Sequence, residues 1–360
     1  MEQRAMTTNT NRLFFTFLTF LFSLFIFACA STAPDDRTAP SWVTSLESAY
    51  PSRQWLAVTA SGETQRTAEQ AAMNALARAF RADVASLTQT TQRFTQIVNE
   101  ASGKRTVSFD ESQNFIQEVN TATNIRFLIG VQTDHYQAKD GTYHANARMN
   151  RRDCAARYSG MIRENTAVIN RLITHADGLA DSFEAYSALN FAAAIAEITD
   201  NFQNILEVLD PATAGRRSSY GGANAVTAKM RELAGRITVG IAVETADRND
   251  ALQISRAVSA FFTDKGFKTA EQTQGQYTLR ANVRFEPQTY SEQLQSSRYY
   301  FNAALESRSG TAVFSFTEDD RKNHTIAAEA KRMALRAVET SVKEGKFAAD
   351  FDTWLNTLIE

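Results

Sequence analysis

The stretch FLIGVQTDHYQAKDGTYHANARMNR, residues 127–151, is the part of the chain whose local structure is easiest to predict. A run that favours a strand, Ile125–Tyr136, is followed by a Lys139-Asp140-Gly141 turn and a second run, Tyr143–Met149. Glycine supplies the positive φ that tight hairpin turns require. The stretch therefore predicts a β-hairpin, and the rest of the chain is interpreted outward from it.

Upstream of the hairpin, the sequence predicts one more strand and a long helix. Trp55–Thr59 is a short apolar run that ends at Ser61-Gly62, as expected for a strand and a turn. Thr67 is the predicted N-cap of the helix. Apolar side chains, most of them Ala, then recur at three- and four-residue steps: Ala68, Ala71, Ala72, Ala75, Leu76, Ala79, Phe80, Val84 and Leu87. Residues 41–152 are therefore predicted to form a small α/β sandwich domain.

These segments resemble a known family. PSWV at 40–43, WLAVTASG at 55–62, the Ala-rich helix and the hairpin at 127–151 occur in the order seen in the lipoprotein-20 family of bacterial envelope lipoproteins. The resemblance covers about a third of the chain. The family typically has a second Gly in the first strand and turn, where this chain has Thr59-Ala60. It implies one helix against a sheet and no catalytic residues. A similar domain begins a periplasmic protein of the flagellar H-ring, which implies a context in flagellar or envelope assembly.

Downstream of the hairpin, residues 153–210 predict a helical connector with two apolar seams. The first seam holds a heptad spacing over four heptads: Tyr158, Ile162, Asn165, Ile169, Leu172, Ala176, Leu179, Phe183 and Tyr186. The second comprises Phe191, Ile195, Ile198, Phe202, Ile205 and Leu209. The phase slips between Tyr186 and Phe191, which predicts a break there. A helical hairpin or helical linker is favoured over a coiled coil that binds a partner, because helices joined by short loops usually pair locally. Asn165 is expected to fix the register.

Pro211 ends the connector, and residues 211–235 predict a loop and a short helix that link to the next domain. The segment PATAGRRSSYGGAN contains a Gly pair that could suggest a phosphate cradle. No strand leads into it, and its spacing matches neither Gly-rich fingerprint. The segment is therefore interpreted as a loop.

Residues 236–360 predict a second domain of the α+β class. Alternating apolar residues indicate strands at Ile237–Val243 and Tyr277–Phe285, and Thr311–Phe316 is a further strand. Between the first two lies a helix, Ala251–Lys265, closed by Gly266. Two helices follow, marked by Ile326, Ala330, Met333, Ala337 and Val338 and by Phe347, Phe351, Trp354 and Leu358. The order β-α-β-β-α-α resembles the amino-terminal domain of Tol-system translocation protein B and the middle domain of the H-ring protein.

The N-terminus contains an apolar run, Leu13–Ala28, with seven of the 24 Phe of the chain. A helix that crosses a membrane needs about 20 apolar residues, whereas this run has 16 and is interrupted by Thr16, Thr19 and Ser23. Arg4 and Arg12 precede it. This length and this flanking charge are typical of a secretion signal, predicted at residues 1–28.

Cys29 stands where the signal would be cut. Ile26, Ala28 and Cys29 resemble the bacterial lipobox, in which the cysteine thiol receives a diacylglycerol and the new amino terminus is acylated, for example with palmitate; Phe27 departs from that pattern. Several acyl chains give stable anchoring, at about 0.8 kcal/mol per buried methylene. Residues 29–40 are polar and contain prolines, as expected for a lipidated tether. Two alternatives stay open: an ordinary signal peptide with an incidental cysteine, and a short signal anchor.

Composition limits the class of protein. Removal of residues 1–28, which carry two Arg and one Glu, changes the net charge from −2 to −3. A slightly acidic chain argues against a nucleic-acid partner, which would require a basic surface. Cys154 is the one other cysteine. If Cys29 is lipidated, Cys154 has no partner within the chain, and it is expected to be buried and inert.

The sequence gives no positive reason to propose an enzyme or a metal site. His135 and His144 flank the 139–141 turn. If the hairpin loop is the two residues Asp140-Gly141, Gln137 lies opposite His144 and both histidines are on one face, but a stable site needs a third ligand and Asp134 is expected on the opposite face. His175, on a helix, and His324, in a charged turn, are expected in solvent, and Asp319-Asp320 and Asp247–Asp250 are expected in turns. No Gly-x-Ser-x-Gly, HExxH, Walker or CxxC motif is present. We therefore predict no catalytic residue, no metal and no cofactor.

Together these features predict an acylated envelope lipoprotein, anchored through Cys29 and facing the periplasm, with a structural or assembly role. Ala30 and Ser31 after Cys29 favour the outer membrane. Envelope proteins are the expected partners, and a homo-oligomer is open. One alternative is a periplasmic small-molecule binder with a pocket between its domains. Another is an enzyme of unrecognised type.

Overall fold

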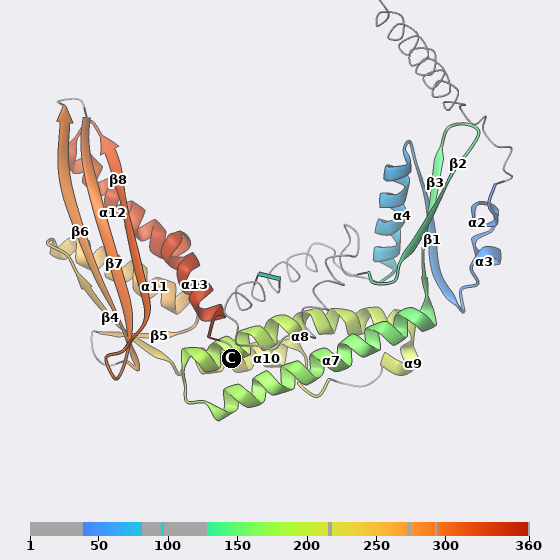
Figure 1. Ribbon diagram of the computed structural model, residues 1–360, viewed down its shortest axis with the longest axis horizontal. Coiled ribbons are helices and arrows are strands. Elements are labelled where there is room, and N and C mark those ends of the chain that lie inside the picture. The colour runs from blue at the N-terminus through green and yellow to red at the C-terminus, as the bar shows by residue number, and fades with distance from the viewer. Residues whose placement is uncertain are drawn as a thin grey trace, which may run out of the picture.

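The computed structural model describes residues 39–80, 95–96, 128–214, 218–271, 275–291 and 294–358. The predicted signal peptide, Cys29 and nearly all of the predicted tether lie outside these residues. The described part confirms the predicted α+β class: two separate sheets, the first covered by one long helix and the second by several, are joined by a pair of long helices (Figure 1).

The first sheet has three antiparallel strands. β1 (Trp55–Gly62) and β2 (Gln132–Gln137) both pair with β3 (Tyr143–Asn150), which lies between them. Two short helices, α2 (Ser41–Thr44) and α3 (Leu46–Ala49), precede β1. The predicted strand at Ile125–Tyr136 is partly wrong, because Leu128–Val131 form a turn and the strand begins only at Gln132.

The turn of the β2–β3 hairpin is one residue longer than a two-residue loop. The N–H of Ala138 donates to the carbonyl of Thr142 at 2.8 Å, and Gly141 has a φ of 88°. A three-residue loop with a left-handed glycine is the next most common hairpin connection. It shifts the pairing by one residue, so Tyr136 and not Gln137 lies opposite His144.

One helix, α4 (Gln65–Ala79), covers one face of this sheet, as predicted. Its N-cap is Thr64 and not the predicted Thr67. Thr64 accepts a hydrogen bond from the N–H of Thr67 at 3.2 Å, and Thr67 Oγ1 accepts one from the N–H of Thr64 at 3.0 Å. The small side chains Ala68 and Ala72 are fully buried, which lets the helix lie close to the strands.

Two long antiparallel helices follow, α7 (Arg151–Gly178) and α8 (Phe183–Leu209). The predicted helical hairpin is confirmed. Asn165 lies in the seam as expected, where its Nδ2 donates to Thr199 Oγ1 at 3.1 Å. The predicted break between Tyr186 and Phe191 is wrong. The chain turns at residues 179–182, and Ser182 caps α8 by accepting from the N–H of Ala185.

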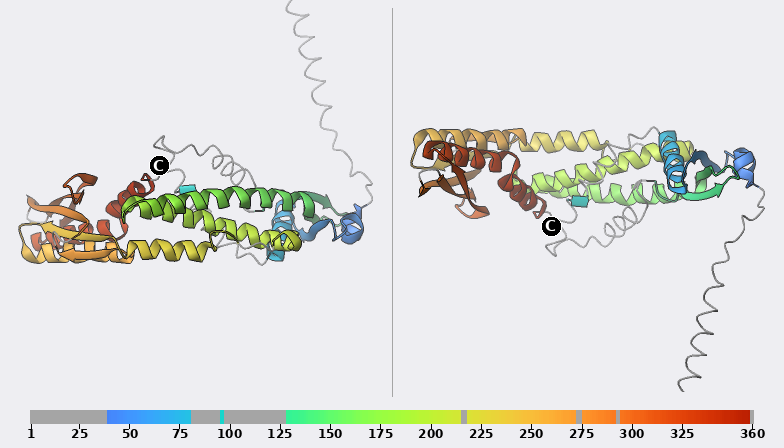
Figure 2. Two further views of the ribbon diagram at one scale, coloured as in Figure 1. Left: turned by 90° about the horizontal axis from the view of Figure 1, so that it is seen from below. Right: turned by 90° about the horizontal axis from the view of Figure 1, so that it is seen from above.

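The predicted linker forms a third helix on this hairpin. After α9 (Pro211–Ala214), α10 (Ala223–Ala234) packs along α8 (Figure 2). Asp200 on α8 holds the start of α10, because its carboxylate accepts from Tyr220 Oη at 2.9 Å and from the N–H of Ala223 at 2.8 Å.

The second sheet has five strands in the order β5-β4-β6-β7-β8. These are β4 (Thr238–Glu244), β5 (Lys268–Glu271), β6 (Tyr277–Ser291), β7 (Leu294–Ser307) and β8 (Ala312–His324). β4 is parallel to both neighbours, and β6, β7 and β8 are antiparallel. The sequence predicted β4, β6 and the first part of β8. It missed β5 and β7.

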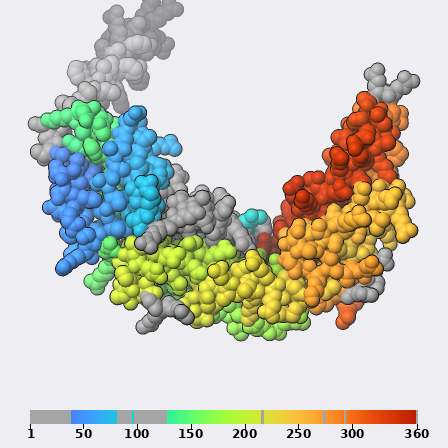
Figure 3. All heavy atoms as spheres, turned by 180° about the vertical axis from the view of Figure 1, so that it is seen from behind, coloured from blue at the N-terminus to red at the C-terminus, as the bar shows by residue number. Residues whose placement is uncertain are grey.

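Three helices accompany this sheet: α11 (Arg248–Asp264), α12 (Ala327–Glu344) and α13 (Lys346–Asn356). Gly266 ends the α11 region with a φ of 89°, as predicted. The helices cover the face that carries Val283, Phe301 and Phe316. Phenylalanine rings dominate this core, with Phe347 and Phe351 at 0% exposure. The two domains stand at opposite ends of the helical layer, on the same side of it (Figure 3).

Candidate functional site

The first domain is fixed to the helical hairpin by hydrogen bonds. β3 runs directly into α7, and Asn150 caps that helix through the N–H of Asp153. Arg151 Nε donates to the carbonyl of Ser52, just before β1, at 2.9 Å, and its Nη1 donates to the carbonyl of Val208 at the end of α8 at 2.6 Å. Fully buried Tyr158 accepts a hydrogen bond from the N–H of Ile129 at 2.9 Å. The domain and the hairpin therefore share one core.

The other end of the hairpin is inserted into the second domain. Phe183 is the first residue of α8 and is 1% exposed. Its ring contacts the rings of Phe267, Tyr277, Phe351 and Trp354, with centroids 4.5–5.9 Å apart. One turn later, Ser187 Oγ donates to the carbonyl of Leu355 on α13 at 2.5 Å. The hairpin and the second domain are therefore joined through a buried cluster of aromatic rings.

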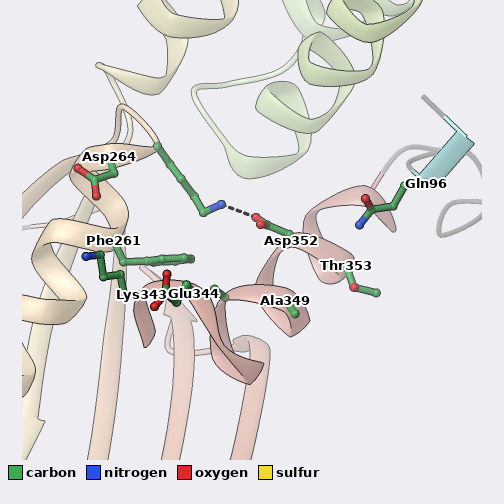
Figure 4. Close-up of a pocket in the computed structure, with 10 residues that line it drawn as sticks. Gln96, Phe261, Asp264, Lys343, Glu344, Ala349, Asp352 and Thr353 are labelled. Atoms are coloured by element: carbon green, nitrogen blue, oxygen red, sulfur yellow. Dashed lines mark hydrogen bonds and ion pairs between the residues drawn. The ribbon is translucent and has the colours of Figure 1, made fainter. Parts of the chain in front are cut away.

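A cavity of about 500 Å³ lies between α11 and the α12–α13 corner (Figure 4). Lys265 Nζ reaches across it to Asp352 Oδ1 at 2.5 Å and lies 4.9 Å from the ring centroid of Phe261. Asp264, Lys343 and Glu344 also line it. A smaller cavity of about 260 Å³ lies beside it at α8 and shares Lys265 and Asp352. Most ligand pockets are predominantly apolar, whereas charged groups dominate this lining and Phe261 is the one ring among the described residues that form the larger cavity.

An open groove of about 540 Å³ runs between β8 and α12. Glu318 on β8 lines it. Its carboxylate accepts from Tyr299 Oη at 2.9 Å and from Ser341 Oγ, and Ser341 Oγ in turn accepts from the N–H of Phe347 at 3.2 Å. Burial is the main cause that raises the pKa of the Tyr299 hydroxyl, and its hydrogen bond to Glu318 raises this pKa further. Lys322, Arg336 and Lys346 line the groove as well.

The sequence pattern did not predict a polar cluster that the structure shows on the outer face of the first sheet. Arg148 Nη1 donates to Asp134 and, at 3.2 Å, to Oδ1 of fully buried Asn146. The guanidinium of Arg148 lies 4.7 Å from the ring centroid of Tyr50 and 6.0 Å from that of Trp55. In the sequence, Asn146 and Arg148 alternate with apolar residues, which marks one face of β3 as polar. The rings that cover this face, Tyr50 and Trp55, are distant in sequence, so the cluster could not be predicted.

The predicted histidines do not come together. Because the hairpin register shifts by one residue, His135 faces α4, where its Nδ1 lies 3.2 Å from Gln65 Nε2, and His144 stacks on Tyr136 on the other face. The expectation that both lie on one face is therefore wrong. His324 is not in a turn but ends β8, where its Nδ1 accepts from the N–H of Ile326. In the described ranges there is no group of three or more His, Cys, Asp or Glu able to hold a metal ion.

The carboxylates that were expected in turns also lie in other elements of the structure. Asp319 and Asp320 lie within β8. Asp247 is the N-cap of α11, and hydrogen bonds from the N–H groups of Asn249 and Asp250 lower its pKa. Asp250 is 8% exposed and its Oδ2 lies 2.7 Å from Lys331 Nζ. These groups cap a helix or form ion pairs.

Cys154 is buried on α7, as predicted. It is 3% exposed, and its Sγ lies 3.8 Å from the carbonyl oxygen of Gly130. Burial raises the pKa of the thiol, which disfavours the reactive thiolate. Within the residues that the structure covers, no helix is long and apolar enough to span a bilayer.

No family model matches this sequence, and a search of curated proteins gives no match. Among solved structures, a secreted protein of Helicobacter pylori is similar at 12% identity and a TM-score of 0.37, over 80% of this chain and 97% of that chain. A minor lipoprotein of Acinetobacter baumannii (13% identity, TM-score 0.24) covers 33% of this chain and 90% of its own. A lipoprotein of Neisseria meningitidis (11% identity, TM-score 0.22) covers 29% and 96%. With these TM-scores, the similarities do not establish a shared fold or function.

Proposed function

We propose that the chain is an acylated lipoprotein of a bacterial envelope, and that it holds two folded domains at a fixed separation within a periplasm-facing complex. The role is structural and non-catalytic. The proposal rests on two features. The first is the lipid anchor predicted at Cys29, and the second, seen in the described residues, is a helical spacer that is joined to a folded domain at each end.

The spacer carries the proposal. α7 has 28 residues and α8 has 27, so at about 1.5 Å per residue the hairpin is roughly 40 Å long. Domains joined by a flexible linker reorient freely. Here the ring of Phe183 and the hydroxyl of Ser187 fix one end, and Arg151, through its hydrogen bond to Ser52, and Tyr158 fix the other. Such an arm suits a component that sets a distance between partners.

The anchor and its location complete the proposal. Ile26, Ala28 and Cys29 supply the lipobox-like site, and residues 30–40 supply a polar tether before α2. Ala30 and Ser31 favour the outer membrane. The resemblance of residues 41–152 to the lipoprotein-20 family favours envelope assembly, with the flagellar H-ring as one setting.

Metabolic labelling with an alkyne analogue of palmitate tests the anchor. Wild-type protein should be labelled and recovered with membranes. Cys29→Ala should lose both label and membrane association, whereas the matched control Cys154→Ala should keep both. An unlabelled wild-type protein, or label that persists in Cys29→Ala, would exclude the proposed anchor.

A second candidate function is the binding of a small zwitterionic molecule in the cavity between α11 and the α12–α13 corner. The volume of about 500 Å³ and the opposed charges of Lys265 and Asp352 favour it. Free amino acids at millimolar concentration are suitable probes. A rise in melting temperature that Asp352→Asn abolishes would support this function, and unchanged melting of the wild-type protein across all of them would count against it.

A further inference from the structure

β8 is the longer of the two outer strands of the second sheet. In the described part of the chain it pairs with β7 on one side and with no strand on the other. It is 13 residues long, contains no proline, and keeps a regular register with β7 from Phe314 to His324. Such an edge presents a row of backbone donors and acceptors to any strand that approaches it.

The direction of these backbone groups follows from one contact. Lys346 Nζ donates to the carbonyl of Thr317 at 3.2 Å in an exposed position, which places this carbonyl on the open side of β8. Outward groups alternate along an edge strand. Thr317, Asp319, Arg321 and Asn323 therefore offer their N–H and C=O groups outward, and the groups of Glu318, Asp320 and Lys322 face β7.

The side chains of β8 carry charges in an order that complements itself. Glu318, Asp319 and Asp320 are acidic, and Arg321 and Lys322 are basic. In an antiparallel pair of two β8 strands with the two-fold axis at Asp320, Asp319 lies opposite Arg321 and Glu318 lies opposite Lys322. Opposite charges in directly opposed positions stabilise a strand pair, and like charges destabilise it.

This register also keeps each residue on its correct face. Asp319 and Arg321 lie on the free face of the sheet, where all odd-numbered residues from Val313 to Asn323 are exposed. Glu318 and Lys322 lie on the face of α12, where they line the groove of about 540 Å³. The groove has room for the Lys322 side chain of an added strand beside Glu318.

Two of these charges have no ion-pair partner in the single chain. Among the described residues, no carboxylate lies within ion-pair distance of Arg321, which instead stacks 5.3 Å from the ring centroid of Tyr290. Glu318 is hydrogen-bonded to hydroxyl groups and has no cation partner in the described ranges. The second strand places Asp319 beside Arg321 and Lys322 beside Glu318, and these two partners also keep an ion pair within their own chain, Asp319 with Arg298 and Lys322 with Asp320. Charges that only protect a strand edge from aggregation could stand in any order, whereas pairing of two copies of β8 requires acidic residues opposite basic ones.

We propose that β8 is a self-association surface, at which two copies of this chain pair antiparallel about Asp320 and join their sheets into one of ten strands. At the centre the two Asp320 carboxylates are opposed, and each has Lys322 Nζ of its own chain 2.6 Å away. The dimer extends the structural role proposed above and does not depend on the lipid. A chain without lipid therefore tests it separately from the anchor.

Charge reversal is the first test, in residues 29–360 with Cys29→Ser, which keep every described residue. Sedimentation equilibrium should show a wild-type dimer at micromolar concentration. Arg321→Asp sets two carboxylates against each other at two symmetric positions and should weaken the dimer roughly tenfold or more. The swap Asp319→Arg with Arg321→Asp should restore it. Arg66→Glu, an exposed charge change on α4, is the matched control and should leave the dimer intact.

A disulfide is the second test, because Asp320 forms a pair with itself that is not hydrogen-bonded, with Cα atoms about 4.5 Å apart. Oxidised Asp320→Cys should run as a covalent dimer. Asn323→Cys should not, because its two copies would lie roughly 20 Å apart at about 3.3 Å per residue. A monomeric wild-type chain, an unaffected Arg321→Asp dimer, or equal cross-linking of both cysteine variants would overturn the proposal. Pairing of β8 with a different protein and not with itself would also overturn it.

Discussion

Replacing Phe183 with Ala tests whether the helical arm and the second domain behave as one rigid body. The ring is 1% exposed and touches four other rings. A buried Phe→Ala change costs about 3–5 kcal/mol. Phe183 contacts several partners that belong to a different domain and cannot all close around the gap, so we expect a loss near 4 kcal/mol, within that same range.

Urea unfolding followed by Trp354 fluorescence is the appropriate assay, because Trp354 lies 5.5 Å from the ring of Phe183. Changing Trp42 and Trp55 to Phe removes the other two tryptophans. If the free energy of unfolding falls by about 2 kcal/mol per M of urea, the expected loss of stability lowers the urea midpoint by roughly 2 M. The native emission of Trp354 should also shift to the red as solvent enters the junction.

Phe202→Ala is the control for this experiment. Phe202 is 2% exposed and packs on Tyr158 at the far end of the hairpin, with centroids 5.4 Å apart. Its loss should destabilise the hairpin but leave the native emission of Trp354 unchanged. A cost below about 1 kcal/mol for Phe183→Ala, with unchanged emission, would refute the claim that this ring joins the two parts.

Four further predictions concern stability. Burial raises the pKa of both Cys154 and Tyr158 in the folded chain, so as pH rises the unfolded chain loses these two protons before the folded chain does. The urea midpoint of unfolding should therefore fall as pH rises above about 9, and it should fall less in Tyr158→Phe. At neutral pH, Tyr158→Phe leaves a buried backbone N–H without its acceptor and should cost about 1–3 kcal/mol in the same titration. Gly62→Ala would place a Cβ 2.5 Å from Thr67 Oγ1 and 2.7 Å from a backbone nitrogen of α4, so thermal unfolding should show a loss of about 1–3 kcal/mol. Asp247→Ala removes the N-cap of α11 and should lower stability by about 1 kcal/mol; an unchanged melting temperature would contradict the capping role.

Periodic segments were predictable from the sequence because their burial repeats regularly. The seams that contain Ile169 and Phe202 are buried in the helical hairpin as expected. The break was misplaced because Phe183 and Tyr186 continue the heptad spacing although they belong to the next helix. Their burial comes from the second domain, which the local pattern does not contain.

Strand prediction failed where local composition opposed the sheet. β5 has only four residues, too few to show alternation. β7 contains Ser296 and Ser297, which are 1% and 2% exposed, so its buried face is not apolar throughout. The hairpin register failed because the turn gained one residue, and this single step separated His135 from His144.

The candidate sites depend on tertiary structure. The cavity between α11 and the α12–α13 corner combines Lys265, which follows α11, with Asp352 on α13, and the two are distant in sequence. The β8 edge exists only because strand order leaves that strand outermost. The charge order of residues 318–322 is visible in the sequence, but its meaning requires knowing that the segment is an edge strand and not a turn. Cys29 remains a sequence prediction, because it lies outside the described residues.

The distance between the two domains tests the central claim most directly. Spin labels at Gln70→Cys on α4 and Asn302→Cys on β7, both exposed, can be measured by pulsed electron resonance in the chain with Cys29→Ser, diluted with unlabelled protein. Buried Cys154 should stay unlabelled. The account predicts one narrow distance distribution, which Phe183→Ala broadens. A broad distribution in the otherwise wild-type chain would show that the hairpin is a flexible linker and would contradict a distance-setting role.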